Sequence, residues 1–168
     1  AIFEGFDTLV NLGAGYDTRA IRMKGIEKLK IYEIDHPDVI LEKQRRLEKA
    51  NISVPANLSF VPVDFDHQDL KAEIEKAGFE LNSKTLFMME GVTQYITREA
   101  FEGTLRFIVT AAQGSRLAFT YVIQDAFDHP EKYPEHKLLM SQFKMFKLTN
   151  MTGYNQSGMD NYLLKFGL

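Results

Sequence analysis

Cysteine is absent from the 168-residue chain, and so are an excess of basic residues and any long apolar run. Without cysteine the protein has no disulfide, no thiolate metal ligand and no cysteine nucleophile. Lysine and arginine number 20 against 23 aspartates and glutamates, and this net charge of −3 argues against a broad surface for nucleic acid. No apolar run approaches the ~18 residues of a membrane-spanning helix. We therefore expect a cytoplasmic protein with neither a nucleic-acid nor a membrane partner.

Several common catalytic motifs are missing as well. No Gly-x-Ser-x-Gly sequence occurs, which argues against a hydrolase nucleophile elbow, and no Walker A sequence occurs that would cradle phosphates. The histidines show no spacing typical of metal ligands and are interpreted as surface residues; they are His36, His67, His129 and His136. The site we expect therefore contains no metal.

Apolar residues make up 45% of the chain and charged residues 26%, which is typical of one globular domain spanning residues 1–168. Short β-rich runs alternate with helical patterns. Strands are predicted at 8–12, 29–34, 58–63, 85–89 and 117–123. Helices are expected from Pro37, around Leu70 and Ile74, and after Thr97. This alternation predicts an α/β fold, a doubly wound parallel sheet with helices on both faces.

Four further segments carry weaker patterns. The charge run 42–49 is interpreted as the solvated face of a helix. Near the end of the chain, a helix is predicted over 137–148, a loop over 150–158 and a short helix over 161–166.

The carboxyl ends of parallel strands form the ligand-binding edge of such a sheet, and the first strand ends in Gly13, Ala14 and Gly15. These glycines let the backbone approach a ligand at a helix N-terminus, although a plain tight turn is the alternative. A dinucleotide fingerprint needs a third glycine at position 18, where the chain has Thr18, so a nicotinamide-dependent oxidoreductase is disfavoured.

Acidic and aromatic side chains follow the other strands. Glu33 and Asp35 lie 20 and 22 residues beyond Gly13, where either carboxylate could accept hydrogen bonds from ribose hydroxyls or sit at a helix N-terminus. Asp64 and Phe65 suit an adenine ring, or Asp64 could cap the following helix.

Glu90 ends an apolar strand and has the right charge for an ammonium or sulfonium group, with a solvated strand-end acid as the alternative. Tyr95 and Tyr121 are candidate substrate contacts, or core aromatics. No residue in the pattern stands out as a catalytic base.

Four motifs resemble those of the leucine carboxyl methyltransferase family. They are VNLGAGYDTR at 10–19, YEIDHP at 32–37 followed by Lys43, VPVDF at 61–65, and MEGV at 89–92 with Tyr95 and Ile96. This family includes enzymes that methylate the C-terminal leucine carboxylate of a protein phosphatase and bacterial O-methyltransferases linked to polyketide biosynthesis.

The resemblance implies a Rossmann-like class I methyltransferase fold and S-adenosylmethionine as cofactor. Its motif positions place Gly13 along the methionine portion, Asp35 at the ribose hydroxyls and Asp64 with Phe65 at the adenine. Glu90 would face the methionine amino group, and Glu33 is the less favoured ribose candidate. The family's usual helical segment before the first strand and its C-terminal strand pair are not evident, so the chain is interpreted as a core truncated at both ends.

The function expected from the resemblance is O-methyl transfer to a carboxylate or hydroxyl oxygen, with a small molecule favoured as the acceptor. One alternative is methylation of a C-terminal leucine carboxylate, in which a peptide is the acceptor. Another is a module that binds a nucleoside cofactor without catalysis. The cationic sulfonium of the cofactor suits an acidic and aromatic rim, and the absence of a pyrophosphate makes a third glycine unnecessary.

Overall fold

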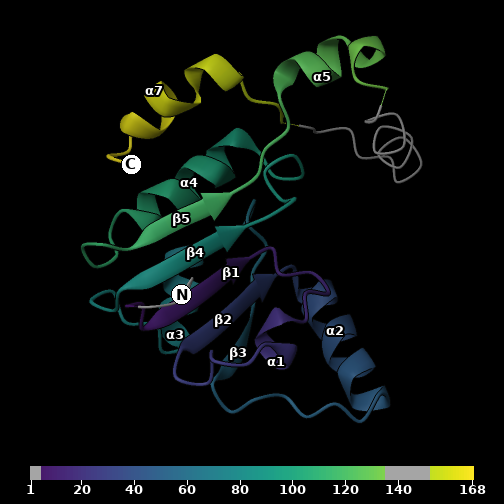
Figure 1. Ribbon diagram of the computed structural model, residues 1–168, viewed down its shortest axis with the longest axis vertical. Helices are drawn as coiled ribbons and strands as arrows, with labels where there is room; N and C mark the ends of the chain where they lie inside the picture. Colours follow the sequence, from purple (N-terminus) through teal and green to yellow (C-terminus); the bar gives the residue numbers. More distant parts are fainter. Residues whose placement is uncertain (1–4, 135–151) are drawn as a thin grey trace.

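A computed structural model describes residues 5–134 and 152–168 of the chain. Its centre is a five-stranded sheet, whose strands are β1 (Thr8–Leu12), β2 (Lys30–Asp35), β3 (Leu58–Pro62), β4 (Thr85–Met89) and β5 (Arg116–Phe119). All neighbours pair in parallel in the order β3-β2-β1-β4-β5 (Figure 1). The order reverses between β1 and β4, which makes their carboxyl ends the switch point of the sheet.

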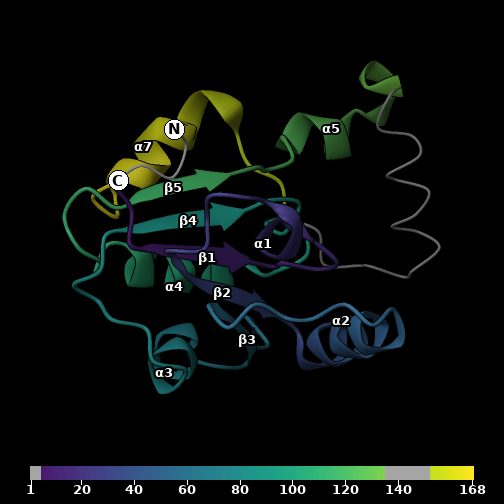
Figure 2. The same cartoon turned by 60° about the horizontal axis from the view of Figure 1, so that its bottom comes forward.

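Helices cover both faces of the sheet, which confirms the predicted fold class. They are α1 (Arg19–Arg22), α2 (Pro37–Lys49), α3 (Leu70–Lys76), α4 (Arg98–Ile108), α5 (Gln124–Asp128) and α7 (Met159–Leu164), with 3₁₀ turns η1 (Pro130–Lys132) and η3 (Gln156–Gly158). Figure 2 shows α1 on one face and α3 and α4 on the other. The helix α7 packs against α4, since the Tyr162 ring stacks 6.4 Å from that of Phe101.

The larger core lies under α3 and α4. Strand residues such as Val10 and Phe87, which are both fully buried, pack against Ile74 of α3 and Phe101 and Leu105 of α4. Full burial of such side chains stabilises the fold by ~1.5–3 kcal/mol each. Thr97 caps α4 as predicted, because its hydroxyl accepts a hydrogen bond from the Ala100 amide.

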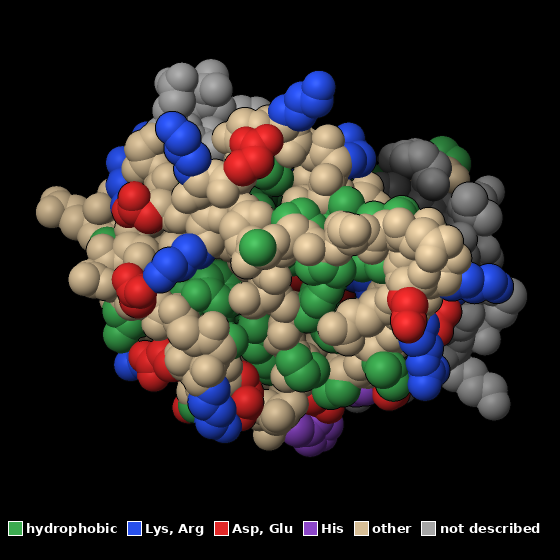
Figure 3. All heavy atoms as spheres, turned by 90° about the horizontal axis from the view of Figure 1, so that it is seen from below, with side chains coloured by type: hydrophobic (Ala, Val, Ile, Leu, Met, Phe, Trp, Pro, Cys, Tyr) green, Lys and Arg blue, Asp and Glu red, His purple; other side chains and the backbone are tan. Residues whose placement is uncertain are grey.

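The opposite face of the sheet has a smaller core, in which Leu9 and Ile31 pack against Ala20 and Ile26. Beside this core lies a cavity of about 600 Å³, here called the sheet-face cavity. Figure 3 shows one face of the molecule on which hydrophobic side chains gather toward the middle and charged groups lie around the rim. Among the described helices, none is long and apolar enough to cross a membrane.

Strands β1 and β4 have the predicted bounds, β2 begins and ends one residue later than predicted, and β3 ends one residue earlier. The prediction for β5 was too long, because the strand ends at Phe119 instead of residue 123. Beyond that point the chain pairs with a distant segment: the Tyr154 amide donates to the Val122 carbonyl, and the Gln124 amide donates to the Tyr154 carbonyl. A long-range partner of this kind leaves no local signal.

The short C-terminal helix begins two residues earlier than predicted, at Met159. Part of the expected loop forms the η3 turn and a bridge between Ile123 and Tyr154. The helix predicted over 137–148 lies outside the described residues. The surface interpretation is confirmed for three histidines, while the fourth lies outside the described residues; His36, His67 and His129 are exposed.

Candidate cofactor site

The loop after β1 depends on two glycines for different reasons. Gly13 has φ +70°, and a Cβ atom there would lie 2.1 Å from Cγ2 of Val92, so a side chain has no room. Gly15 has φ +50°, but in the described part of the chain no atom beyond its sequence neighbours lies within 4 Å of its Cβ position. The amides of Gly13 and Ala14 both donate to the Ile34 carbonyl, at 2.7 and 2.9 Å. The loop is therefore held against the end of β2.

A second cavity of about 870 Å³ opens where β1, β2, β3 and β4 end, and it is called the strand-end cavity below. Its size falls within the range of ~300–1,000 Å³ that is usual for small-molecule sites. It brings together most of the site residues predicted from the sequence, namely Gly13, Ala14, Gly15, Asp35, Asp64, Phe65, Glu90 and Tyr95. Parallel strands deliver these residues to one edge although up to 82 positions separate them.

Asp35 anchors the glycine loop. One carboxylate oxygen accepts a hydrogen bond of 2.6 Å from the Gly15 amide, and the other accepts one of 2.7 Å from the His36 amide. An ionised carboxylate offers about four acceptor positions, so Asp35 keeps capacity for further donors in the strand-end cavity. A vicinal pair of hydroxyls is a group that such a carboxylate can recognise.

Asp64 forms a local turn after β3. Its carboxylate accepts from the Asp66 amide at 3.0 Å and lies 2.9 Å from Nδ1 of His67. Burial alone would raise the pKa of Asp64, but these hydrogen bonds outweigh it and hold the pKa below its ordinary value. The alternative role as a helix cap is wrong, because Asp69 caps α3 through the amides of Lys71 and Ala72.

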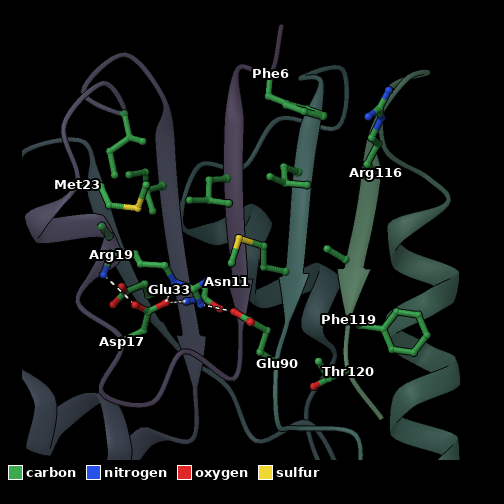
Figure 4. A pocket seen from close by; sticks show the side chains of 17 residues that line it. Phe6, Asn11, Asp17, Arg19, Met23, Glu33, Glu90, Arg116, Phe119 and Thr120 are labelled. Carbon is green, nitrogen blue, oxygen red and sulfur yellow. Dashed lines mark hydrogen bonds and ion pairs between the residues drawn. The ribbon is translucent and has the colours of Figure 1, made fainter. Parts of the chain in front are cut away.

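Glu90 belongs to a chain of charged groups that Figure 4 shows from close by. Its carboxylate pairs with a terminal nitrogen of Arg19, whose Nε donates to Asp17 at 2.6 Å. Asp17 also accepts from the Asn11 side chain at 2.9 Å. Glu90 is half exposed and lines both the strand-end and the sheet-face cavities.

Arg19 and Asp17 were not among the predicted site residues, although both lie inside the first motif. Burial would raise the pKa of Asp17, but the hydrogen bonds from the backbone and side chain of Arg19 lower it below its ordinary value. Arg19 and Glu90 lie 71 positions apart in the sequence, so no local sequence pattern predicts their contact. It supplies a cation to a rim whose predicted residues are acidic and aromatic.

Glu33 lies apart from the strand-end cavity. It is 1% exposed, lines the sheet-face cavity and pairs with Lys43 of α2 at 2.5 Å. Burial raises the pKa of the Glu33 carboxyl above its ordinary value, and the nearby ammonium group only partly opposes this. The geometry thus favours Asp35 over Glu33 as the ribose ligand, while a cofactor role for either stays a prediction.

The charge run 42–49 is not solvated throughout, contrary to the prediction from the sequence. Most of it is solvated as predicted, but the Lys43 side chain is only 3% exposed, because its ammonium group reaches inward to Glu33. Helical spacing also turns Leu47 into the interior.

The two candidate tyrosines differ in their surroundings. Tyr95 is 44% exposed and lines the strand-end cavity. Tyr121 packs against the larger core, with ring centroids 5.8 Å from Phe119 and 6.2 Å from Tyr154. The core alternative therefore describes Tyr121 better, and substrate contact by either tyrosine remains a prediction. Among residues 5–134 and 152–168, no group of three His, Asp or Glu side chains could hold a metal ion.

Comparison with known proteins decides the family of this chain. The family model described as leucine carboxyl methyltransferase matches residues 1–109. The chain belongs to this family. A relative from Bacillus subtilis, named "Putative S-adenosyl-L-methionine-dependent methyltransferase YktD", is 34% identical over 125 residues, 73% of this chain and 41% of that protein. A relative from Mycobacterium marinum with the same description is 31% identical over 139 residues, 82% of this chain and 46% of its own length.

The chain thus spans less than half the length of these curated relatives. Solved structures support the fold alone. An O-methyltransferase family protein from Burkholderia thailandensis superposes with a TM-score of 0.67 at 13% identity, covering 100% of this chain and 47% of that one. A "duf574 family protein" from Streptomyces avermitilis gives a TM-score of 0.66 at 13% identity, covering 96% and 62%. This leucine carboxyl methyltransferase family member therefore has the class I methyltransferase fold.

Proposed function

We propose that this family member is an S-adenosylmethionine-dependent O-methyltransferase whose cofactor lies in the strand-end cavity. The observation that carries the proposal is the convergence of Asp35, Asp64, Phe65 and Glu90 around the Gly13 loop, at the switch point of the sheet. The names of the curated relatives support the choice of cofactor.

The residues present fit this cofactor in charge and shape. Asp35, beside the glycine loop, would accept hydrogen bonds from the ribose hydroxyls. Phe65 offers an aromatic face, and the Asp64 carboxylate an acceptor for the adenine amino group. Glu90, at the end of β4, would hold the methionine ammonium group. Glycine at position 13 lets the loop lie close against Val92, where a side chain would collide, and this loop would border the methionine portion.

When bound, the cofactor supplies a methyl group already activated by its sulfonium. The chain's own task is to orient an acceptor oxygen in line with that carbon and to exclude water. The proposed acceptor is a carboxylate or hydroxyl of a small molecule. The family description, which names a carboxyl acceptor, supports transfer to oxygen, and the bacterial relatives support a small molecule over a phosphatase tail. A carboxylate acceptor is ionised at neutral pH and therefore needs no general base.

The test is a coupled assay of S-adenosylhomocysteine release with two acceptor sets, small phenols and carboxylic acids, and a peptide that ends in leucine. We expect release with at least one small molecule and its loss in Asp35→Ala. Release only with the peptide would support the phosphatase-type alternative. Saturable cofactor binding without turnover in either set would support a non-catalytic binding module.

A further inference from the structure

The Glu33–Lys43 pair is a buried ion pair that the proposed chemistry does not use. The two side chains are 1% and 3% exposed, and one oxygen of Glu33 has no hydrogen-bond partner among the described residues. Removing two charges from water is expensive, and an apolar pair of similar volume is often at least as stable. Stability alone is therefore a weak explanation for this arrangement.

Lys43 makes a second contact that reaches the cofactor loop. Its ammonium group donates to the backbone carbonyl of Asp17 at 2.6 Å, besides donating to Glu33 at 2.5 Å. A charge-assisted hydrogen bond in a buried setting holds its partner more firmly than a neutral one. Lys43 therefore ties the end of the glycine loop to both α2 and β2.

Asp17 connects Lys43 to Arg19 and, through Arg19, to Glu90 in the strand-end cavity. Its side chain accepts from the backbone amide of Arg19 at 2.8 Å and from Nε of Arg19 at 2.6 Å. Arg19 in turn pairs with Glu90 across the sheet edge. One continuous chain of contacts thus runs from Lys43 to the carboxylate proposed to hold the cofactor's ammonium group.

We propose that Lys43 is a positioning residue, whose buried ammonium fixes the Asp17 backbone and, through Arg19, the Glu90 carboxylate for cofactor binding. The expected effect on cofactor binding rests on the proposed function, whereas the contacts from Lys43 to Glu90 do not depend on it. Glu33 serves mainly to neutralise Lys43 in the interior, because its free oxygen contacts no donor of the loop.

The test compares two variants of the protein. Glu33→Gln keeps Lys43 and its bond to Asp17 but leaves the buried ammonium without a counter-charge, so it should unfold at a lower urea concentration than wild type. The apolar pair Glu33→Met/Lys43→Met removes both charges together. Urea unfolding, S-adenosylmethionine affinity and amide hydrogen exchange of residues 17–19 are measured on each. We expect the double variant to unfold at a urea concentration no lower than wild type, yet to bind the cofactor at least tenfold more weakly. Glu33→Gln should bind within a few-fold of wild type.

Hydrogen exchange separates this proposal from the proposed function, because it needs no cofactor. Faster exchange at residues 17–19 in the double variant, but not in Glu33→Gln, supports the positioning role of Lys43. This holds even if the wild-type protein binds no S-adenosylmethionine. Exchange and affinity equal to wild type in the double variant would overturn the positioning role. Should the apolar pair fail to fold, Glu33→Gln/Lys43→Gln takes its place under the same criteria.

Discussion

Gly13→Ala should be far more damaging than Gly15→Ala, although both glycines lie in one loop at positive φ. An alanine in the left-handed region costs ~1–2 kcal/mol at either position. At Gly13 the new Cβ would also lie 2.1 Å from Cγ2 of Val92, and relieving such overpacking typically costs ~1–3 kcal/mol. The total is ~2–5 kcal/mol at Gly13, against ~1–2 kcal/mol at Gly15, where no described atom beyond the sequence neighbours lies within 4 Å.

Urea unfolding followed by circular dichroism measures the difference. With a denaturant dependence of ~2 kcal/mol per molar urea, the middle of the usual range, the midpoint of Gly13→Ala should fall by ~1–2.5 M. Val92→Ala provides the matched background, since the nearest atom left in it, Cβ of residue 92, would lie 3.2 Å away. In that background the stability lost in Gly13→Ala should come close to that lost in Gly15→Ala. Equal losses at the two glycines in the wild-type background would refute the reasoning.

Two pH dependences follow from the buried groups. Burial and the hydrogen bond to Glu102 raise the pKa of Tyr162 from 10 to about 12. The stability that Tyr162 contributes is therefore fully present below pH 10 and is lost as the pH rises through about 12. Urea midpoints across this range should fall less steeply in Tyr162→Phe, and an equal slope would contradict the assignment. The lowered pKa of Asp17 contributes stability above its ordinary value of 3.8, and this is lost as the pH falls through the lowered value. Arg19→Met removes the side-chain hydrogen bond and the positive charge that lower it, while the backbone amide of residue 19 still donates to Asp17. Acid unfolding should therefore begin at a higher pH; an unchanged acid midpoint would show that the Arg19 side chain does not stabilise the carboxylate.

The sequence predicted the five strands and the helices α2, α3, α4 and α7 in their order along the chain, because each of these elements has its own periodicity and its own start or stop residues. It did not predict α5, which lies beyond β5. It also predicted which acids would meet, since the carboxyl ends of parallel strands lie at one edge: Asp35, Asp64 and Glu90 share the strand-end cavity. Strand alternation could not separate Glu33 from Asp35, because residues two apart face the same side. The two carboxylates differ in their position along the strand and in burial. Glu33 lies buried within β2 beneath α2, while Asp35 ends the strand at the strand-end cavity.

Contacts between distant side chains were beyond prediction. Lys43 stands in a run of charged residues that predicts a solvated face, and only the packing of α2 against β2 turns it inward. The pairing of Arg19 with Glu90 likewise depends on β1 and β4 being neighbours, which the order of strands along the chain does not state.

The most direct test of the account is a calorimetric titration with S-adenosylmethionine and S-adenosylhomocysteine, with NAD as a control ligand. Wild type and Asp38→Ala, which removes a carboxylate 90% exposed on α2 outside the cavity, should bind both sulfur compounds saturably and NAD not at all. Asp35→Ala should lose ~1–3 kcal/mol of cofactor binding, because charge-assisted hydrogen bonds to the ribose would be gone. Equal affinity in Asp35→Ala and wild type would contradict the placement of the cofactor in the strand-end cavity.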